Sequence, residues 1–392
     1  YGFGGLSFSG LLRARAQAKD IASAAGSAFD QSFNNTGEPT AIILVWLRGG
    51  CSHLDTWDPK PDASSEFRSP FNPINTNVPG IVLTELLPTL SKCADKYSLL
   101  RSVAHTGGGH PAGSLQILAG DPAAADKRLP VLPDWMSIAN YLRYNSKRKI
   151  PNYITVNPVD RYDSFTIAGS TYLGPSYEPF KVTGDPNRPD FSVPNIGLSD
   201  PSLAARFKSR INLKRGLDRL QAEIDQTGAM EAFDDFDRQA LSLLTSKDAA
   251  HAFDLSQEKQ RTRERYGMNQ WGQQCLMARR LVEAGVEIVT TEFDGPLCGR
   301  VGNWDDHAVN HHVFDAIQHR APVFDQAISA LIEDVYARGL DKRVLVVVTG
   351  EFGRTPRISH VASSGGGVAS GTKGTVQPGR DHWPRANTML FA

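Results

Sequence analysis

Histidine and carboxylate side chains recur in the segments that follow apolar runs of this chain. The candidate metal ligands are His53, Asp55, Asp305, His307, Glu351, Asp381 and His382. Imidazole binds zinc, manganese and iron readily, and carboxylates neutralise the charge of a divalent ion. Asp305 and His307 stand two positions apart, a spacing at which both side chains can point to one ion. We therefore expect a divalent metal site, with zinc as the favoured ion and manganese, iron or calcium as alternatives.

Each candidate ligand also has a structural interpretation. Asp305 would then cap a helix. The candidates at 53 and 55 would belong to a turn stabilised by an aspartate side chain, and those at 381 and 382 to a solvated turn. Glu351 lies between the glycines at 350 and 353, after an apolar run. It would be a metal ligand or a general base, and the structural alternative is an ion pair with Arg354. His311 and His312 are expected at the surface or behind the ligands.

A glycine run at residues 107–109 precedes His110. It lacks the Gly-Lys-Ser/Thr ending of a Walker loop and does not match the dinucleotide fingerprint, so no nucleotide cradle is expected. Either the run lets the backbone approach a tetrahedral anion, or it is a flexible turn. In the first case Arg48, Arg354 and Arg380 would be planar clamps for that anion.

The candidate ligands follow short apolar runs that are typical of strands buried in a parallel sheet. Amphipathic helices are predicted at residues 268–284 and 313–338. The order of these elements predicts an α/β fold, a doubly wound and mostly parallel sheet with helices on both faces, whose ligands bind beyond the carboxyl ends of the strands. The expected strands are residues 41–47, 97–104, 287–293 and 344–349.

The composition excludes some classes of partner. Lys+Arg and Asp+Glu both number 42 among 392 residues, and 40% of the residues are hydrophobic. Folding is therefore expected, and there is no overall field that would draw the chain to nucleic acid or an anionic membrane. The first apolar stretch is too short to span a bilayer, so no integral membrane segment is expected.

The spacing of the cysteines favours buried thiols over a single disulfide; they are Cys51, Cys93, Cys275 and Cys298.

Residues 1–35 are interpreted as the remnant of an export signal and an Ala-rich linker, because a Gly/Leu/Phe/Ser run precedes small residues. A frayed surface helix is the alternative. The remaining residues, 36–392, are predicted to form one α/β domain.

The middle of this domain differs from its flanks. Residues 121–201 contain many prolines and little periodicity, apart from a short strand at 153–156. A long amphipathic helix then opens at Asp200, and further polar helices are expected up to about Tyr266. We expect residues 121–266 to be an insertion or cap on a core made of residues 36–120 and 267–392.

Three motifs carry a family resemblance: WLRGGCSHLDTWDPKP at 46–61, VTGEFGRTP at 348–356 and GRDHWP at 379–384. They resemble the signatures of the bacterial domain-of-unknown-function family 1501, over about residues 36–392. The resemblance implies export by the twin-arginine route, and hence a periplasmic or extracellular location. It also implies a fold similar to that of the alkaline phosphatase and sulfatase superfamily, whose members hydrolyse phosphate or sulfate esters at one or two metals. Family members usually continue further, so we expect the chain to be truncated at its C-terminus.

The superfamily pattern transfers only in part. The position of its nucleophile is occupied by His110, where no Ser, Thr or Cys stands, and the sulfatase signature Cys-x-Pro-x-Arg is absent. Arg48 stands where the superfamily has a metal-binding aspartate, which shifts ligation to the candidates at 53 and 55. The resemblance implies later ligands by position at Asp305, His307, Glu351 and His382.

The favoured hypothesis is an exported, metal-dependent hydrolase of phosphate or sulfate esters, acting on a small-molecule or polysaccharide substrate. Asp305, His307 and His382 would hold one ion. Glu351, Asp55 and His53 would either hold a second ion or complete the coordination of the first.

The metal would activate water and polarise the ester. His110 would be a nucleophile or a general acid, and Glu351 and Arg354 would complete the catalytic residues. The alternative is a non-catalytic protein of the cell surface that binds a polysaccharide or a protein partner in the same pocket. The sequence predicts no oligomeric state.

Overall fold

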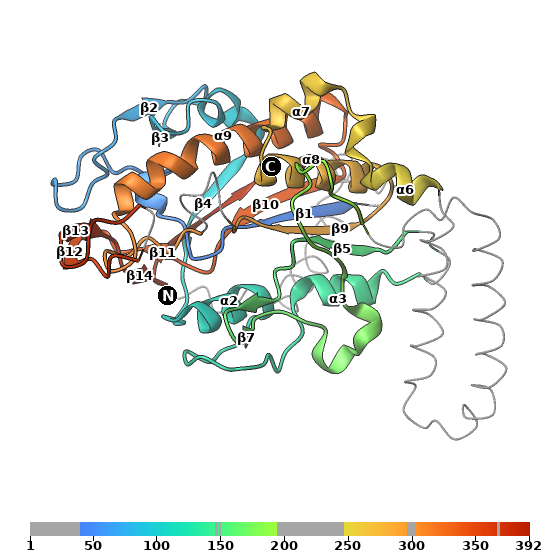
Figure 1. Ribbon diagram of the computed structural model, residues 1–392, viewed down its shortest axis with the longest axis horizontal. Coiled ribbons are helices and arrows are strands. Elements are labelled where there is room, and N and C mark those ends of the chain that lie inside the picture. The colour runs from blue at the N-terminus through green and yellow to red at the C-terminus, as the bar shows by residue number, and fades with distance from the viewer. Residues whose placement is uncertain (1–39, 146–147, 149, 194–246, 296–302, 367–368) are drawn as a thin grey trace, which may run out of the picture. The chain divides into compact units, whose positions relative to one another are not determined.

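A seven-stranded sheet lies at the centre of the chain (Figure 1). The computed structural model describes residues 40–145, 148, 150–193, 247–295, 303–366 and 369–392. The strand order is β4-β15-β10-β1-β9-β5-β8. In chain order, the strands of this sheet are β1 (Ala41–Trp46), β4 (Ser98–Val103), β5 (Tyr153–Val156), β8 (Phe180–Val182), β9 (Ile288–Glu292), β10 (Val344–Thr349) and β15 (Asn387–Phe391).

Most strand pairs in this sheet are parallel. β1 pairs in parallel with β10 and β9, and β5 pairs in parallel with β9 and β8. β15 is antiparallel to both of its neighbours, β10 and β4, so β4 runs in the same direction as the parallel strands. The predicted mixture of helices and a mostly parallel sheet is therefore confirmed. The antiparallel strand β15 was not predicted.

Helices cover both faces of the sheet (Figure 1). α8 (Gln270–Glu283) and α9 (Val313–Ala337) lie on one face, and α2 (His110–Ala119) and α3 (Trp135–Leu142) lie on the other. The helices predicted at 268–284 and 313–338 correspond to α8 and α9.

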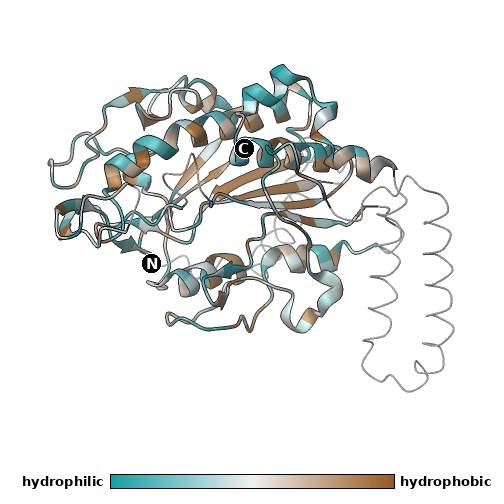
Figure 2. Ribbon diagram, in the orientation of Figure 1, coloured by the Kyte–Doolittle hydropathy of each residue, from teal (hydrophilic) through white to brown (hydrophobic). Residues whose placement is uncertain are grey.

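Successive side chains of β1 enter two different apolar clusters. Ile43 and Val45 pack with side chains of α8 and α9, whereas Leu44 packs with Leu118 of α2 and Met136 of α3. Because both faces are buried there, the central strands β1 and β10 must be apolar at nearly every position. Figure 2 shows this concentration of hydrophobic residues in the strands. This is the physical reason why continuous apolar runs predicted β1, β9 and β10.

The stretch 121–266, expected as an insertion or cap, contributes β5 and β8 to the central sheet. The strand predicted at 153–156 is confirmed as β5. The same stretch provides α3 and a hairpin of β6 (Arg161–Tyr162) and β7 (Phe165–Thr166). The long helix expected from Asp200 lies outside the described residues, and so does the expected export signal at 1–35.

Shorter elements surround the sheet in the described part of the chain. Three two-stranded pairs are β2 (Pro73–Asn75) with β3 (Val82–Thr84), β11 (Gly353–Arg354) with β14 (His382–Trp383), and β12 (Ser359–Ala362) with β13 (Val376–Gly379). The remaining helices are α6 (Lys247–Phe253), α7 (Gln260–Tyr266), η1 (His53–Asp55), η2 (Leu90–Lys96), η3 (Thr171–Leu173), η4 (Pro175–Tyr177) and η5 (Leu255–Gln257).

Cys51, Cys93 and Cys275 are buried free thiols, as the cysteine spacing favoured. Cys298 lies outside the described residues. Within the described ranges, no helix combines the length and the apolar character needed to cross a membrane.

Candidate metal centre

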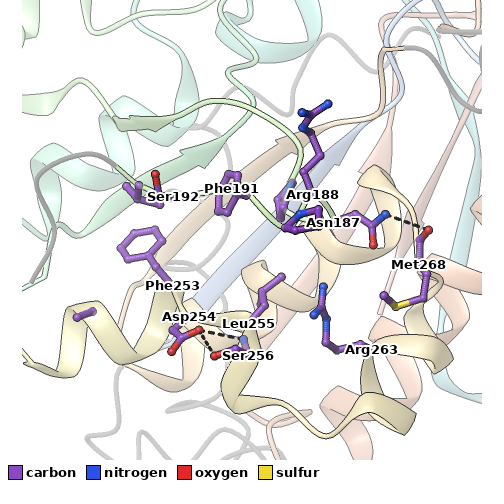
Figure 3. A pocket seen from close by; sticks show the side chains of 14 residues that line it. Asn187, Arg188, Phe191, Ser192, Phe253, Asp254, Leu255, Ser256, Arg263 and Met268 are labelled. Atoms are coloured by element: carbon purple, nitrogen blue, oxygen red, sulfur yellow. Dashed lines mark hydrogen bonds between the residues drawn. The ribbon is translucent and has the colours of Figure 1, made fainter.

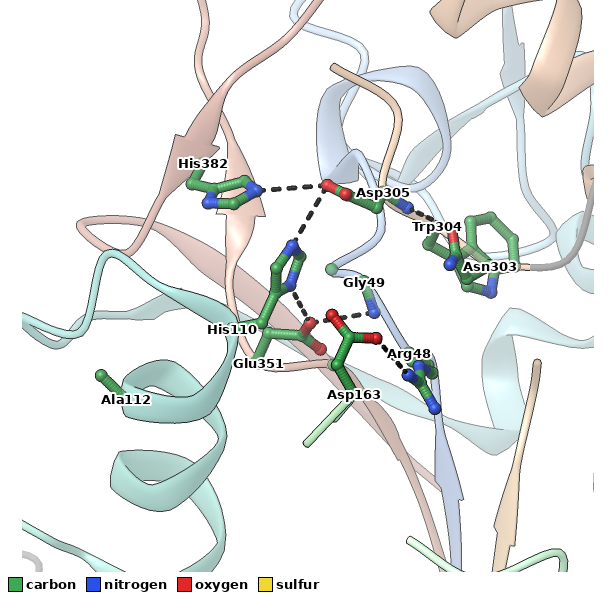
Figure 4. Close-up of polar contacts among 12 residues, drawn as sticks. Arg48, Gly49, His110, Ala112, Asp163, Asn303, Trp304, Asp305, Glu351 and His382 are labelled. Carbon is green, nitrogen blue, oxygen red and sulfur yellow. Dashed lines mark hydrogen bonds and ion pairs between the residues drawn. The ribbon is translucent and has the colours of Figure 1, made fainter. Parts of the chain in front are cut away.

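Side chains from four segments meet beyond the carboxyl ends of the parallel strands (Figure 4). His110 begins α2 shortly after β4, Asp305 lies in the connection that follows β9, and Glu351 lies two positions after the end of β10. His382 reaches the same place because β14 pairs with β11, just beyond Glu351. Convergence at this edge is what an open α/β sheet predicts.

Asp305 lies at the centre of three imidazoles. Its Oδ1 atom is 3.3 Å from Nε2 of His110 and 3.1 Å from Nε2 of His382. Its Oδ2 atom is 3.1 Å from Nε2 of His307. One ligand atom from each of His110, Asp305 and His382 lies within 4.8 Å of the others, a spacing that one metal ion can bridge. The side chain of His382 is 26% exposed, so the cluster can be reached from solvent.

The second nitrogen of each ring shows which atom is available to an ion. Nδ1 of His382 is 2.9 Å from the carbonyl oxygen of Gly108, which can only accept, so this nitrogen carries a proton. Nδ1 of His110 donates in the same way to Oε1 of Glu351 at 2.6 Å. In the neutral rings, both Nε2 atoms therefore direct a lone pair toward Asp305. Such an arrangement is stable when a proton or a cation lies between the acceptors, and it fits the donor set of zinc.

Glu351 orients His110. Its side chain is fully buried, and Oε1 also accepts a hydrogen bond from the backbone amide of Gly49 at 2.9 Å. The backbone carbonyl of Glu351 bonds Nε2 of His105 at 2.6 Å. Its atom Oε2 has no hydrogen-bond partner among the described residues. Glu351 thus bonds the nitrogen of His110 that faces away from the ion position. In this position it fixes the tautomer and the direction of the His110 ring.

Positive charge is required at this cluster. Burial lowers the pKa of His110, but its hydrogen bonds to Asp305 and Glu351 outweigh this effect and raise the pKa to about 9. Burial likewise opposes ionisation of Asp305, yet hydrogen bonds from the three histidines and the charge of Arg354 hold its pKa well below the ordinary value. A bound cation would supply the positive charge that the His110 proton otherwise supplies.

Arg354 is a structural clamp. It is fully buried, and NH2 donates to Oδ1 of Asp305 at 2.8 Å. The same guanidinium donates to backbone carbonyl oxygens of Gly50 at 2.9 Å and Trp304 at 3.1 Å, and also to that of Gly49. The expected pairing of Arg354 with Glu351 is not among these contacts. With these donors occupied, Arg354 holds the connection after β1 against the one that carries Asp305, and it does not clamp an anion.

Three candidate ligands lie elsewhere. Asp55 and Arg380 form a fully buried ion pair, with Arg380 Nε 2.8 Å from Oδ2 of Asp55, so neither is free for a metal or an anion. Ser52 also donates to Asp55, at 2.5 Å. His53 is buried, and this burial lowers its pKa to about 4. Asp381 is exposed, and its backbone amide donates a hydrogen bond to Oγ1 of Thr355 at 2.9 Å.

Sequence reasoning missed residues that support the cluster. Nδ2 of Asn310 lies 3.0 Å from Nε2 of His307 and donates to Oδ2 of Asp305 at 3.3 Å. This contact occupies the nitrogen that His307 would offer, which places His307 at the rim of the cluster. Only its spacing from His307 in the sequence could have indicated Asn310. Asn310 follows His307 by one turn, and its backbone amide donates to the His307 carbonyl at 2.9 Å.

Two cavities lie apart from the cluster. One of about 600 Å³ is lined by residues 186–189, 191–193, parts of α6 and η5, Arg263 and Met268 (Figure 3). The other, of about 550 Å³, includes His53, Asp58, Lys60 and Arg101 among its lining residues. Neither lining includes the three residues that converge on the candidate ion position.

A comparison of the sequence with curated proteins finds no match. A family model does match, over residues 39–392, which includes every strand of the central sheet and all the residues of the cluster. The chain therefore belongs to the family described as "Protein of unknown function (DUF1501)".

Proposed function

We propose that the protein is a metal-dependent hydrolase of phosphate or sulfate esters. His110, Asp305 and His382 would hold the ion, which is zinc by preference and manganese, iron or calcium otherwise. The observation that carries this proposal is the direction of the two Nε2 atoms, which face one carboxylate oxygen. Their Nδ1 atoms bond a carboxylate and a backbone carbonyl, which is the usual support behind metal-binding histidines.

A divalent ion at this position would lower the pKa of a water molecule and polarise the oxygen of an ester. The residues of the chain do the remaining work: Glu351 keeps the proton on Nδ1 of His110, and Arg354 fixes Asp305. In this arrangement His110 is a ligand, because its Nε2 faces the ion position. The ester class comes from the resemblance to the alkaline phosphatase and sulfatase superfamily, whose fold is part of the proposal.

The test combines metal analysis with turnover. Purified protein supplied with zinc should retain close to one ion per chain and hydrolyse an aryl phosphate or an aryl sulfate. Asp305→Asn should lose both properties, because it removes the charge that the imidazoles share. Asp381→Asn is the matched control, since Asp381 is exposed and belongs to the same candidate set. Absence of bound metal in the wild type would overturn the proposal.

A second candidate function is binding without turnover. The absence of Ser, Thr or Cys at position 110 favours it, because the covalent route of the resembled superfamily needs such a side chain. A protein that retains zinc but hydrolyses neither ester would support a non-catalytic protein of the cell surface with a polysaccharide or protein partner.

Export by the twin-arginine route, to the periplasm or the cell exterior, belongs to the same proposal and rests on the family resemblance. Fractionation of cells that express the natural gene tests it. Recovery of the protein in the cytoplasmic fraction alone would contradict export, without bearing on the metal site.

A further inference from the structure

An aromatic side chain covers one face of the His110 ring. The ring of Tyr162 lies 4.1 Å from that of His110, centre to centre, with only 8° between the two planes. Tyr162 belongs to β6 of the β6–β7 hairpin and is 7% exposed. Phe352 lies 5.1 Å from the His110 ring at a tilt of 39°. Among these contacts, the parallel stack with Tyr162 is the one that sets the plane of the imidazole.

Arg48 holds Tyr162 in place. Its guanidinium carbon lies 4.4 Å from the centre of the Tyr162 ring, at a distance typical of a cation–π contact. The imidazole and the guanidinium cannot share one face of the phenol at these distances, so Tyr162 lies between them. Arg48 also bonds the hairpin itself, through the carbonyl of Arg161 at 3.4 Å. It bonds the carboxylate of Asp163 as well, at 3.4 Å (Figure 4).

The hairpin needs such an anchor. Its two strands contain two residues each, and Asp163 in the turn has a φ of 52°. A two-stranded hairpin of this size has little stability by itself. Arg48 lies two positions after the end of β1 and is also fixed from the other side, by Asp294 at 3.3 Å. The hairpin is therefore attached to the end of the central sheet at the edge where the metal cluster lies.

The stack supplies a restraint that the hydrogen bonds of His110 do not. The bond from Nδ1 to Glu351 fixes one atom of the imidazole but leaves the ring free to tilt about that contact. A parallel ring against its face removes this freedom, and Nε2 then points to Oδ1 of Asp305. The contact is made by the two ring planes, so it depends on the aromatic ring of Tyr162 rather than on its hydroxyl.

We propose that Tyr162 is a positioning residue for His110, and that the Arg48–Tyr162 pair makes the β6–β7 hairpin one wall of the metal centre. The inference rests on the proposed function, because it assigns the hairpin a role in holding the ligand. It extends the site to a segment in which the sequence showed no motif. The prediction specific to it is that metal affinity depends on an aromatic ring at position 162 and not on its hydroxyl.

The test measures the zinc dissociation constant by competition with a chelating dye, and the visible spectrum of the cobalt-loaded protein. Tyr162→Ala should weaken zinc binding by about 10- to 100-fold, as loss of a support behind a ligand does, and should change the cobalt spectrum. Tyr162→Phe, which keeps the stacked ring, should restore both. Arg161→Ala is the matched control, because this neighbour on β6 has an exposed side chain.

Unfolding in the presence of a chelator shows whether each variant folds without metal. If Tyr162→Ala does not fold, Arg48→Gln tests the inference instead, because it keeps the Tyr162 ring and removes its anchor. Arg48→Gln should weaken zinc binding, and unchanged zinc binding in this variant would overturn the inference. Zinc affinity that is unchanged in a folded Tyr162→Ala, or reduced equally in Tyr162→Phe, would also overturn it while the proposed function stands. A wild-type protein that binds no zinc would overturn the proposed function first and the role of Tyr162 with it.

Discussion

The carboxylate of Glu351 lies fully buried beside His110, two positions after the end of β10 in the central sheet. One of its oxygens receives hydrogen bonds from Nδ1 of His110 and from the amide of Gly49. A charged acceptor in this position makes a stronger bond than a neutral one, and it keeps Nε2 of the same ring unprotonated once a metal is bound. The contribution of Glu351 is therefore to the direction and basicity of His110.

Glu351→Gln keeps the size of the side chain and replaces the charged acceptor with an amide. We expect the zinc dissociation constant to rise by about 10- to 100-fold, as is usual when a partner behind a ligating histidine is altered. Competition with a chelating dye measures this change. Glu66→Gln serves as the control, because Glu66 is exposed. Equal affinity in the wild type and Glu351→Gln would show that Glu351 does not orient the ligand.

Asp55 lies apart from the candidate metal cluster, in an ion pair. It is fully buried and paired with Arg380, which is also fully buried. Asp55→Asn should lower the free energy of unfolding by about 3–5 kcal/mol, because an unpaired guanidinium is left inside the protein. Zinc affinity of the folded variant should stay at the wild-type value. Urea unfolding and a zinc titration test the two statements separately, and a loss of zinc binding without a loss of stability would make Asp55 a ligand.

At the level of elements, length decided what the sequence could predict. β1 and β10 are almost entirely apolar over six residues, so their pattern was clear. The pair β11–β14 has two residues in each strand, too few for any periodicity, yet it places His382 beside Asp305. The chemical types of the ligands were therefore predictable, whereas the pairing that brings His382 to the cluster was not.

Gly49 lies between β1 and the cluster. A substitution at Gly49 would test how closely the connection after β1 must approach the one that carries Asp305. Its φ is 101°, and a Cβ atom there would lie 2.5 Å from the amide nitrogen of Asp305. Gly49→Ala should lower the free energy of unfolding by about 1–3 kcal/mol from overpacking, in addition to about 1–2 kcal/mol from the left-handed backbone. It should also weaken zinc binding, because the Asp305 backbone must move.

Gly80→Ala is the control for Gly49→Ala. Gly80 has a φ of 86°, but a Cβ atom there would meet nothing within 4 Å. It therefore carries the backbone strain without the close contact. We expect this variant to lose about 1–2 kcal/mol of stability and to bind zinc as the wild type does. If the two variants lose the same amount and both bind zinc normally, the approach of Gly49 to Asp305 is not important for the site.

At the scale of the whole chain, the strand ends indicated where the ligands lie but not which candidates would meet. Asp305 and Glu351 follow β9 and β10, the two neighbours of β1, and both reach the cluster. Asp55 follows β1 itself, yet it lies against Arg380. The direction in which a connection leaves the sheet depends on its turns, and Gly49 and Gly50 both have positive φ values there. Such backbone geometry is not encoded in residue spacing.

The last prediction concerns the coupling of metal binding to the stability of the whole chain. The cluster joins segments far apart in the sequence; His110 and Glu351, for example, are 241 positions apart. An ion that binds only the folded chain should stabilise it by about 4 kcal/mol when free zinc is a thousand-fold above its dissociation constant. Thermal unfolding in excess zinc should therefore occur at a higher temperature than in a chelator, and Asp305→Asn should abolish this difference. If the wild type unfolds at the same temperature in both media, the residues around Asp305 do not form a metal site, since binding energy at a folded site is necessarily folding energy.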